Sequence, residues 1–336
     1  MNKFYKLLFL NIMTLGTLIA ISSSCWITTW IGLEINLLAI IPMMKNHSSI
    51  YPNESTTKYF LAQAMASGMF LMSLIYSLKI FNFSPTSDFS ASLLVTSALL
   101  MKMGAAPFHA WLPEVFAGLN WDMIFIIMTW QKIAPMILLD NTSKSPTLLS
   151  IIIIISSLIG GLMGFNQICL RKMMAFSSIN HTAWMISSLM SSIKIWLFYF
   201  IIYTIINLMI ISMFMMNKLY FMSQLYKTIS KNKKIKFIFM TNFLSLGGLP
   251  PFLGFLPKWI TIHFLVKNQF FMMAALLSIL TLLSLYFYMR LSLSSFSFNT
   301  KESFVKMLDK FNYFYFLVNI LSLMGLMIST IISDFT

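Results

Sequence analysis

Long apolar stretches separated by short polar ones follow one another along almost the whole chain. Each is about 20 residues long, the length of a helix that crosses the hydrocarbon core of a bilayer. The pattern therefore predicts an all-α integral membrane protein, with one polytopic membrane domain over residues 1–336. Eleven spans are predicted, at residues 4–23, 25–44, 57–81, 90–117, 120–140, 147–169, 173–191, 195–216, 237–266, 270–290 and 312–333.

Two of these spans are predicted to be broken, the fourth and the ninth. Residues 100–114 and 244–259 are apolar but rich in proline and glycine. Proline removes a backbone donor and clashes with the preceding helical turn. Broken backbone at membrane depth is tolerated only where it is buried in protein or lines a wet cavity. The breaking residues are Gly104, Pro107 and Pro113 in one segment, and Gly247, Gly248, Pro250, Pro251, Gly254 and Pro257 in the other.

The spacing of the breaks predicts an internal repeat. The two broken spans lie five spans apart, so they run in opposite directions through the membrane. Residues 4–140 and 147–290 are therefore predicted to form two inverted five-helix repeats, each with a discontinuous fourth helix. Residues 291–336 then form a loop and one further helix. Paired broken spans in corresponding halves point to a transporter with its site at the breaks.

Composition and charge agree with a membrane protein and predict its orientation. The chain is 58% hydrophobic and 10% charged, with a mean hydropathy of +0.82 and a net charge of +14. Of the 23 Lys and Arg residues, sixteen fall on the side of the N-terminus, four on the opposite side and three inside spans. The positive-inside rule then predicts an N-terminus in the cytoplasm or matrix and a C-terminus on the other face.

Six lysines lie in the connection 216–236. Such a basic segment docks to acidic lipid headgroups or to a partner subunit in some membrane proteins. Plain positive-inside bias explains the same lysines without any docking, and the sequence leaves both interpretations open.

Four ionisable residues lie near the centres of spans: Glu34, Lys102, Lys132 and Lys258. A charge at mid-bilayer costs about 2.5–3.5 kcal/mol on the insertion scale, so pairing or neutralisation must offset most of the cost. Desolvation favours a neutral lysine and a nearby acid favours a charged one. A Glu34–Lys102 pair that opens and closes would therefore take up and release a proton. The alternative is that these side chains only hold helices together.

Two histidines are weaker candidates for a proton relay. His181 lies within a span and His109 lies at the first break. Histidine is suited to proton transfer near neutral pH, but a structural core histidine explains either residue equally well. The sequence contains no G-x-G-x-x-G, no Walker loop and only two cysteines. It predicts no redox cofactor, no metal and no nucleotide hydrolysis on this chain.

Four segments carry a resemblance to a known family. They are residues 30–36 (WIGLEIN), 128–135 (MTWQKIAP), 171–179 (RKMMAFSSI) and 244–259 (LSLGGLPPFLGFLPKW). From about residue 10 to 292 the chain is similar to the subunit 2 family of mitochondrial NADH dehydrogenase, an antiporter-like family of respiratory complex I. It differs from the bacterial members, which have three further spans at the start.

The resemblance implies a proton-translocating subunit of NADH:ubiquinone oxidoreductase, a multi-pass protein of the mitochondrial inner membrane. The N-terminus would lie in the matrix and the C-terminus in the intermembrane space. Partners would be the other membrane-arm subunits, including the sister antiporter-like subunits, and phospholipids, cardiolipin among them; no nucleic acid is expected. NADH, FMN, iron–sulfur clusters and ubiquinone would bind to other subunits.

The family's functional positions carry over to Glu34, Lys102, Lys132 and Lys258, with His181 as a link along a central hydrated axis. In the implied mechanism, quinone reduction elsewhere perturbs a charge near Glu34, and the change passes to Lys102, Lys132 and Lys258. A secondary monovalent cation/proton antiporter subunit is the alternative function, since it would use the same repeats and lysines.

Overall fold

The computed structural model describes residues 4–45, 50–80, 86–142, 145–231 and 233–297. In these ranges the regular structure is helical, apart from one β-bridge between Cys169 and Phe221. The predicted last span, 312–333, lies outside the described residues. The helices are α1 (Phe4–Ser22), α2 (Trp26–Met44), α3 (Ile50–Ile80), α4 (Thr86–Met103), α5 (Trp111–Gly118), α6 (Trp121–Met128), α7 (Trp130–Asn141), α8 (Pro146–Gly164), α9 (Leu170–Ser191), α10 (Ile193–Met216), α11 (Met222–Lys231), α12 (Lys233–Gly247), α13 (Phe255–Lys267) and α14 (Phe271–Ser297).

The all-α membrane class is confirmed, in a coarser form than predicted. In the described part of the chain, seven helical stretches are long and apolar enough to cross a membrane. The two broken spans are not among the seven, because each half of a broken span is short. Helix α9 is not among them because it is rich in polar residues. The seven are Phe4–Ser22, Trp26–Met44, Ile50–Ser77, Trp121–Asn141, Pro146–Gly164, Ile193–Met216 and Phe271–Ser292.

Both predicted breaks are present, and both begin in the same way. Gly104 follows α4 with φ +70°, and Gly248 follows α12 with φ +77°. At the first break Ala105 N–H donates to the carbonyl of Leu100, and at the second Leu249 N–H donates to that of Leu244. These bonds, with the left-handed glycine, make a Schellman motif, which satisfies carbonyls at a helix C-terminus. Each helix therefore ends in a defined turn.

A side chain from the far side of each break provides a further donor. At the first break Trp111 Nε1 donates to the carbonyl of Met101 at 3.2 Å. At the second, Lys258 Nζ donates to the carbonyl of Gly247 at 2.8 Å. The last carbonyls of a helix have no partner within the helix, so each of these contacts joins the two halves of a broken span.

Three details depart from the prediction. The predicted span 120–140 is interrupted at Thr129, whose side chain donates to the carbonyl of Phe125 at 2.7 Å. Helix α3 begins at Ile50 rather than at residue 57. Its first turns were left out of the predicted span because they are polar, but α3 packs against α5. The basic connection contains α11, which was expected to be a loop. Leu225 on α11 is fully buried while Lys227 is exposed, so this helix is amphipathic.

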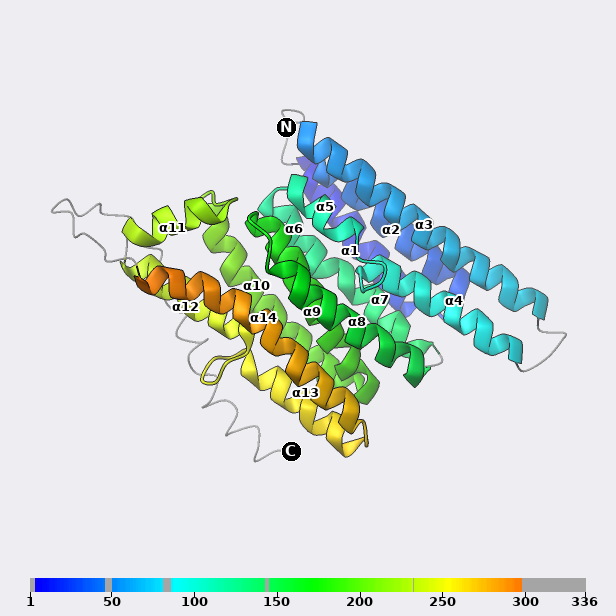
Figure 1. Ribbon diagram of the computed structural model, residues 1–336. Coiled ribbons are helices and arrows are strands. Elements are labelled where there is room, and N and C mark those ends of the chain that lie inside the picture. The colour runs from blue at the N-terminus through cyan, green and yellow to red at the C-terminus, as the bar shows by residue number, and fades with distance from the viewer. Residues whose placement is uncertain (1–3, 46–49, 81–85, 143–144, 232, 298–336) are drawn as a thin grey trace. The chain divides into compact units, whose positions relative to one another are not determined.

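The chain divides into two compact units, residues 1–156 and 157–336. In the first unit α3 lies alongside α4 and also packs against α2, and α7 packs against both α4 and α6 (Figure 1). In the second unit α9 packs against α10, α13 and α14, and α12 packs against α14. Eighteen residues of α9 are buried, so this polar helix is enclosed by protein.

We predict that Gly32→Ala weakens the packing of α1 on α2. A Cβ at Gly32 would lie 2.6 Å from the backbone nitrogen of Ala20, so the helices must separate, at a cost of about 1–3 kcal/mol. The matched control is Gly68→Ala, where a Cβ meets nothing within 4 Å. Thermal melting of the purified protein should show a lower midpoint for Gly32→Ala alone. Equal midpoints for the two variants would contradict this packing.

We also predict that Gly248→Ala disturbs the second break. Alanine in the left-handed region costs about 1–2 kcal/mol, and its Cβ would lie 2.9 Å from Lys258 Nζ. At Gly247, the neighbouring control, the nearest atom to a new Cβ is at 3.5 Å. Hydrogen exchange of the amides around the break should be faster in Gly248→Ala than in Gly247→Ala. The same exchange in both variants would show that the break does not depend on this geometry.

Candidate functional site

Two predicted site residues, Lys102 and Glu34, lie in the first unit. Lys102 is in the last turn of α4 and only 7% exposed. Glu34, on α2, is half-buried and acts electrostatically on Lys102. Among the described residues no ion pair joins Glu34 to Lys102. Lys58, elsewhere in this unit, forms ion pairs with Glu54 and Glu114. The Glu34–Lys102 pairing therefore stays a prediction, and the two form no closed salt bridge in this structure.

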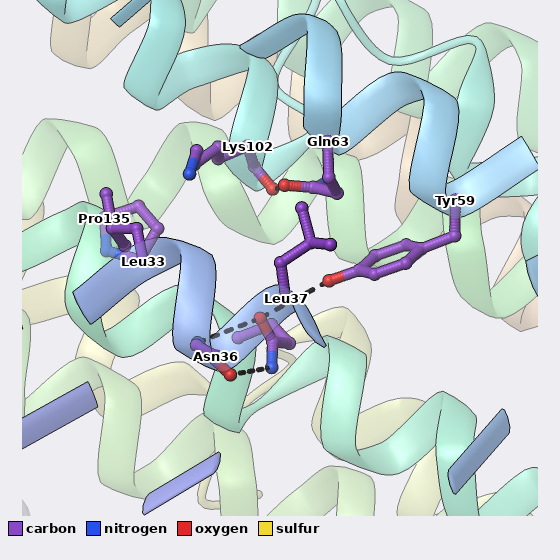
Figure 2. A pocket seen from close by; sticks show the side chains of 8 residues that line it. Leu33, Asn36, Leu37, Tyr59, Gln63, Lys102 and Pro135 are labelled. Atoms are coloured by element: carbon purple, nitrogen blue, oxygen red, sulfur yellow. Dashed lines mark hydrogen bonds between the residues drawn. The ribbon is translucent and has the colours of Figure 1, made fainter. Parts of the chain in front are cut away.

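A small cavity lies beside Lys102 (Figure 2). About 10 Å³ of it is open to a water-sized sphere, which is close to the space that one water needs. In Figure 2 the Lys102 amine points toward the side where Leu33 and Pro135 lie. The cavity is lined by Leu33, Asn36, Leu37, Tyr59, Gln63, Lys102, Gln131 and Pro135. Five of these eight residues are polar, so the site is suited to a hydrogen-bonded water.

Amide side chains organise this cavity. Asn36 and Gln131 form a reciprocal pair: Gln131 Nε2 donates to Asn36 Oδ1 at 2.8 Å, and Asn36 Nδ2 donates to Gln131 Oε1 at 3.2 Å. Tyr59 donates to the same Gln131 oxygen at 3.4 Å (Figure 2). Gln63 donates to the backbone carbonyl of Lys102 at 3.3 Å. The cavity walls are thus tied together from α2, α3, α4 and α7.

Lys132 lies in the first turn of α7 and is 2% exposed. It follows Gln131 directly, and α7 packs against α4, which carries Lys102. The interruption at Thr129 starts α7 just before this lysine. The predicted burial of Lys132 is therefore present, on a helix that lines the Lys102 cavity.

His109 lies within the first break, where it is half-buried. Its Nδ1 is 3.1 Å from the carbonyl oxygen of Pro107. This contact is local to the connection between α4 and α5, so it stabilises the turn.

In the second unit Lys258 is 7% exposed and lies in the first turn of α13. Besides its bond to Gly247, its ammonium lies 5.8 Å from the ring centroid of Trp184 on α9. A cation within about 6 Å of an aromatic face is attracted to it. Lys258 therefore has a carbonyl and an aromatic ring as partners inside the protein.

His181, on α9, is 5% exposed and takes part in an aromatic cluster. Its Nδ1 lies 2.9 Å from the hydroxyl of Tyr199, and its ring centroid lies 5.0 Å from that of Tyr203. A second cavity, also with about 10 Å³ open to a water-sized sphere, is lined by His181, Tyr199, Ile202, Tyr203, Ile206, Ser245, Leu246, Gly254 and Pro257. It reaches from His181 to the residue before Lys258.

Further polar side chains of α9 are buried in the same unit. Asn180 is fully buried and donates to the hydroxyl of Ser284 on α14 at 3.0 Å. On α10, fully buried Asn207 donates to the carbonyl of Tyr203 at 3.0 Å. Buried polar groups at this depth need such partners, and they give α9 and α10 a polar interior surface.

The sequence analysis did not assign a role to Asn36, Gln131, Tyr59, Tyr199 or Tyr203. Their signal was present, because Asn36 and Gln131 are polar residues within predicted spans and next to Glu34 and Lys132. The three tyrosines could not be told from interfacial aromatic residues by sequence. Among the described residues no group of three His, Cys, Asp or Glu side chains is placed to hold a metal ion.

Comparisons with known proteins place the chain in a family. The family model described as "NADH:quinone oxidoreductase/Mrp antiporter, TM" matches residues 23–284. The chain is 45% identical to the NADH-ubiquinone oxidoreductase chain 2 of Locusta migratoria, over 88% of this chain and 86% of the relative. It is 44% identical to the protein of that name from Aedes aegypti, over 99% of each chain.

Solved structures agree on the fold. A chain of respiratory complex I from Thermus thermophilus is similar with a TM-score of 0.83 and 22% identity, over 97% of this chain and 79% of that one. A chain of the Mrp complex from Dietzia is similar with a TM-score of 0.73 and 16% identity, over 88% and 61%. Given its matches over most of its length, the chain belongs to the NADH-ubiquinone oxidoreductase chain 2 family, with the membrane domain shared by NADH:quinone oxidoreductases and Mrp antiporters.

Proposed function

We propose that this chain is a proton-translocating membrane subunit of NADH:ubiquinone oxidoreductase, in the mitochondrial inner membrane. One observation carries the proposal: three lysines, Lys102, Lys132 and Lys258, are buried in apolar helices at or near helix interruptions. Buried lysines are costly in a membrane and mark ion pathways. The relatives from Locusta migratoria and Aedes aegypti are chains of an NADH-ubiquinone oxidoreductase. This supports the proposal that the transported ion is the proton.

The surroundings of the lysines suit proton transfer. A lysine can pass a proton only through a hydrogen-bonded partner, and each cavity beside Lys102 and near Lys258 has about the space of one water. Glu34 acts on Lys102, and His181 lines the cavity that reaches toward Lys258. The proposed order runs from Glu34 and Lys102 to Lys132 and then to Lys258. In this order His181 is a relay residue and His109 has the weaker claim.

The proposal includes eleven spans in two inverted repeats, residues 4–140 and 147–290, with the last span at 312–333. The matching Schellman motifs at Gly104 and Gly248 support the repeat. The lysines themselves do not correspond, because Lys102 precedes its break and Lys258 follows its own. The distribution of Lys and Arg supports an N-terminus in the matrix and a C-terminus in the intermembrane space.

In this proposal the chain does no redox chemistry. NADH, FMN, iron–sulfur clusters and ubiquinone belong to other subunits, and quinone reduction there changes a charge near Glu34. The chain's own part is to hold and pass protons. Its enzymatic role is therefore that of a translocating subunit within the larger oxidoreductase.

The second candidate is a subunit of a secondary monovalent cation/proton antiporter. The fold shared with the Mrp complex from Dietzia favours it. The two functions differ in what drives the protons: electron transfer within the same assembly, or a counter-moving cation. An antiporter subunit would show cation-dependent proton movement in vesicles without NADH.

We predict that Lys132→Met in the assembled complex slows NADH-driven proton pumping at least tenfold, an increase of about 1.4 kcal/mol or more in the barrier. Methionine keeps the length of the buried side chain and removes its ionisable group. Lys194→Met, which makes the same chemical change at an exposed lysine, is the control and should pump normally. Pumping rate and protons moved per electron would be measured in proteoliposomes. Normal values in Lys132→Met would contradict the proposed pathway.

We propose further that anionic phospholipids neutralise the basic face of the second unit. The sequence from residue 157 to 297 contains twelve Lys and Arg and no Asp or Glu, and nine of the twelve lie on the N-terminal side. Amphipathic α11 lies at this end, and Arg171 stacks on Tyr220 at 4.9 Å. Counter-charge must come from outside residues 157–297, and acidic headgroups attract such clusters.

The lipid proposal predicts less anionic phospholipid in the purified complex carrying Lys172→Gln and Lys218→Asn. Asparagine is chosen because Lys218 has φ +49°, a conformation that asparagine tolerates. The control carries Lys194→Gln and Lys267→Gln, on the opposite predicted face. Lipid extraction and mass spectrometry would measure the content. An equal content in both double variants would contradict the proposal.

A further inference from the structure

The Asn36–Gln131 pair is a direct connection between the helix of Glu34 and the helix of Lys132. Asn36 lies two residues after Glu34 on α2, and Gln131 directly precedes Lys132 on α7. The two amides face each other with both hydrogen bonds made, at 2.8 and 3.2 Å. Turning either amide by half a turn would oppose nitrogen to nitrogen and oxygen to oxygen. Neither amide can therefore turn alone, and the orientation seen here is one of two that keep both hydrogen bonds.

Tyr59 strengthens this orientation from a third helix. The Tyr59 residue is only 2% exposed. Its hydroxyl donates to Gln131 Oε1 at 3.4 Å. The Gln131 oxygen thus receives two donors, one from α2 and one from α3. The Tyr59 ring also packs edge-on against Trp111, at 5.7 Å between centroids, and Trp111 bridges the first break. The amide pair is in this way tied to the break itself.

The pair also forms a wall of the Lys102 cavity (Figure 2). An amide NH₂ has two hydrogens and an amide oxygen two lone pairs. The bond from Gln131 Nε2 to Asn36 Oδ1 uses one hydrogen of that nitrogen and one lone pair of that oxygen. The second hydrogen of Gln131 Nε2 and the second lone pair of Asn36 Oδ1 are left for a water. Pro135, which lines the same cavity, has no N–H to give to the backbone carbonyl of Gln131 one turn earlier. That carbonyl therefore lacks the usual helical donor four residues later.

We propose that Asn36 and Gln131 are positioning residues for proton transfer: their pair sets the separation of Glu34 and Lys132 and orients a water beside Lys102. The inference rests on the proposed function and names residues that act through the lysines. Amides suit this role because they do not titrate. Their geometry therefore persists while the lysines gain and lose protons, whereas a carboxylate in either place would pair with a lysine.

The test is a double-mutant cycle in the assembled complex, with Asn36→Leu, Gln131→Leu and both together. Each single variant should lower the NADH-driven pumping rate about tenfold, which corresponds to ~1.4 kcal/mol, the scale of one or two neutral buried hydrogen bonds. The double variant should be no slower than the singles, because either change already removes the pair. Independent, multiplying losses would overturn the inference.

Two further variants separate positioning from mere stability. The exchange Asn36→Gln with Gln131→Asn keeps two facing amides and should recover most of the pumping rate. Gln167→Leu removes a half-buried amide that donates to the carbonyl of Met163, away from the Lys102 cavity lining, and it should pump normally. A purely structural role would lower the amount of assembled complex and leave the rate per complex unchanged, and that result would overturn the inference.

The Lys132→Met variant keeps this inference distinct from the proposed function. Slow pumping in Lys132→Met together with normal pumping in Gln131→Leu would overturn the positioning role alone. Normal pumping in both would overturn the proposed function and the positioning role with it. Slow pumping in both, with recovery in the exchanged pair, is the result that we expect.

Discussion

The carbonyl groups at the two helix breaks impose the constraint on which the rest of this structure depends. A helix that ends inside an apolar surround leaves its last carbonyls without partners, and each costs several kcal/mol if nothing bonds to it. Here a left-handed glycine, Gly104 or Gly248, closes each end with a Schellman motif. A donor from beyond the break, Trp111 or Lys258, then bonds to a terminal carbonyl. Hydrogen bonds thus close the helix end at both breaks.

The two donors differ in a way that matters for function. The indole of Trp111 is neutral at every pH of interest, so the first break is held while Lys102 is left to face its cavity. At the second break the donor is Lys258 itself, so the group proposed to carry a proton also joins α12 to α13. The two units share a framework and use it differently. Only in the second does the framework bond involve an ionisable side chain.

Much of this architecture could be predicted from the sequence, because spans and breaks are local features. Apolar length identifies α1, α2 and α10, and proline with glycine identifies both interruptions. The amphipathic helix α11 was not predicted, because its apolar face is short and lies within a segment rich in lysine. The buried lysines were predicted, with Glu34 as a partner of Lys102, but the amides and the tyrosine around the Lys102 cavity were not. Asn36, Gln131 and Tyr59 come together from three helices, and no local pattern in the chain contains that contact.

In the proposed function, this chain works as a membrane subunit of an NADH-oxidising assembly. The most direct measurement is a native gel of gently solubilised membranes, stained for NADH oxidation and analysed by mass spectrometry for this chain. We expect the chain to migrate with a large assembly that oxidises NADH. Detection only in a small band without NADH oxidation would contradict the account and favour the antiporter.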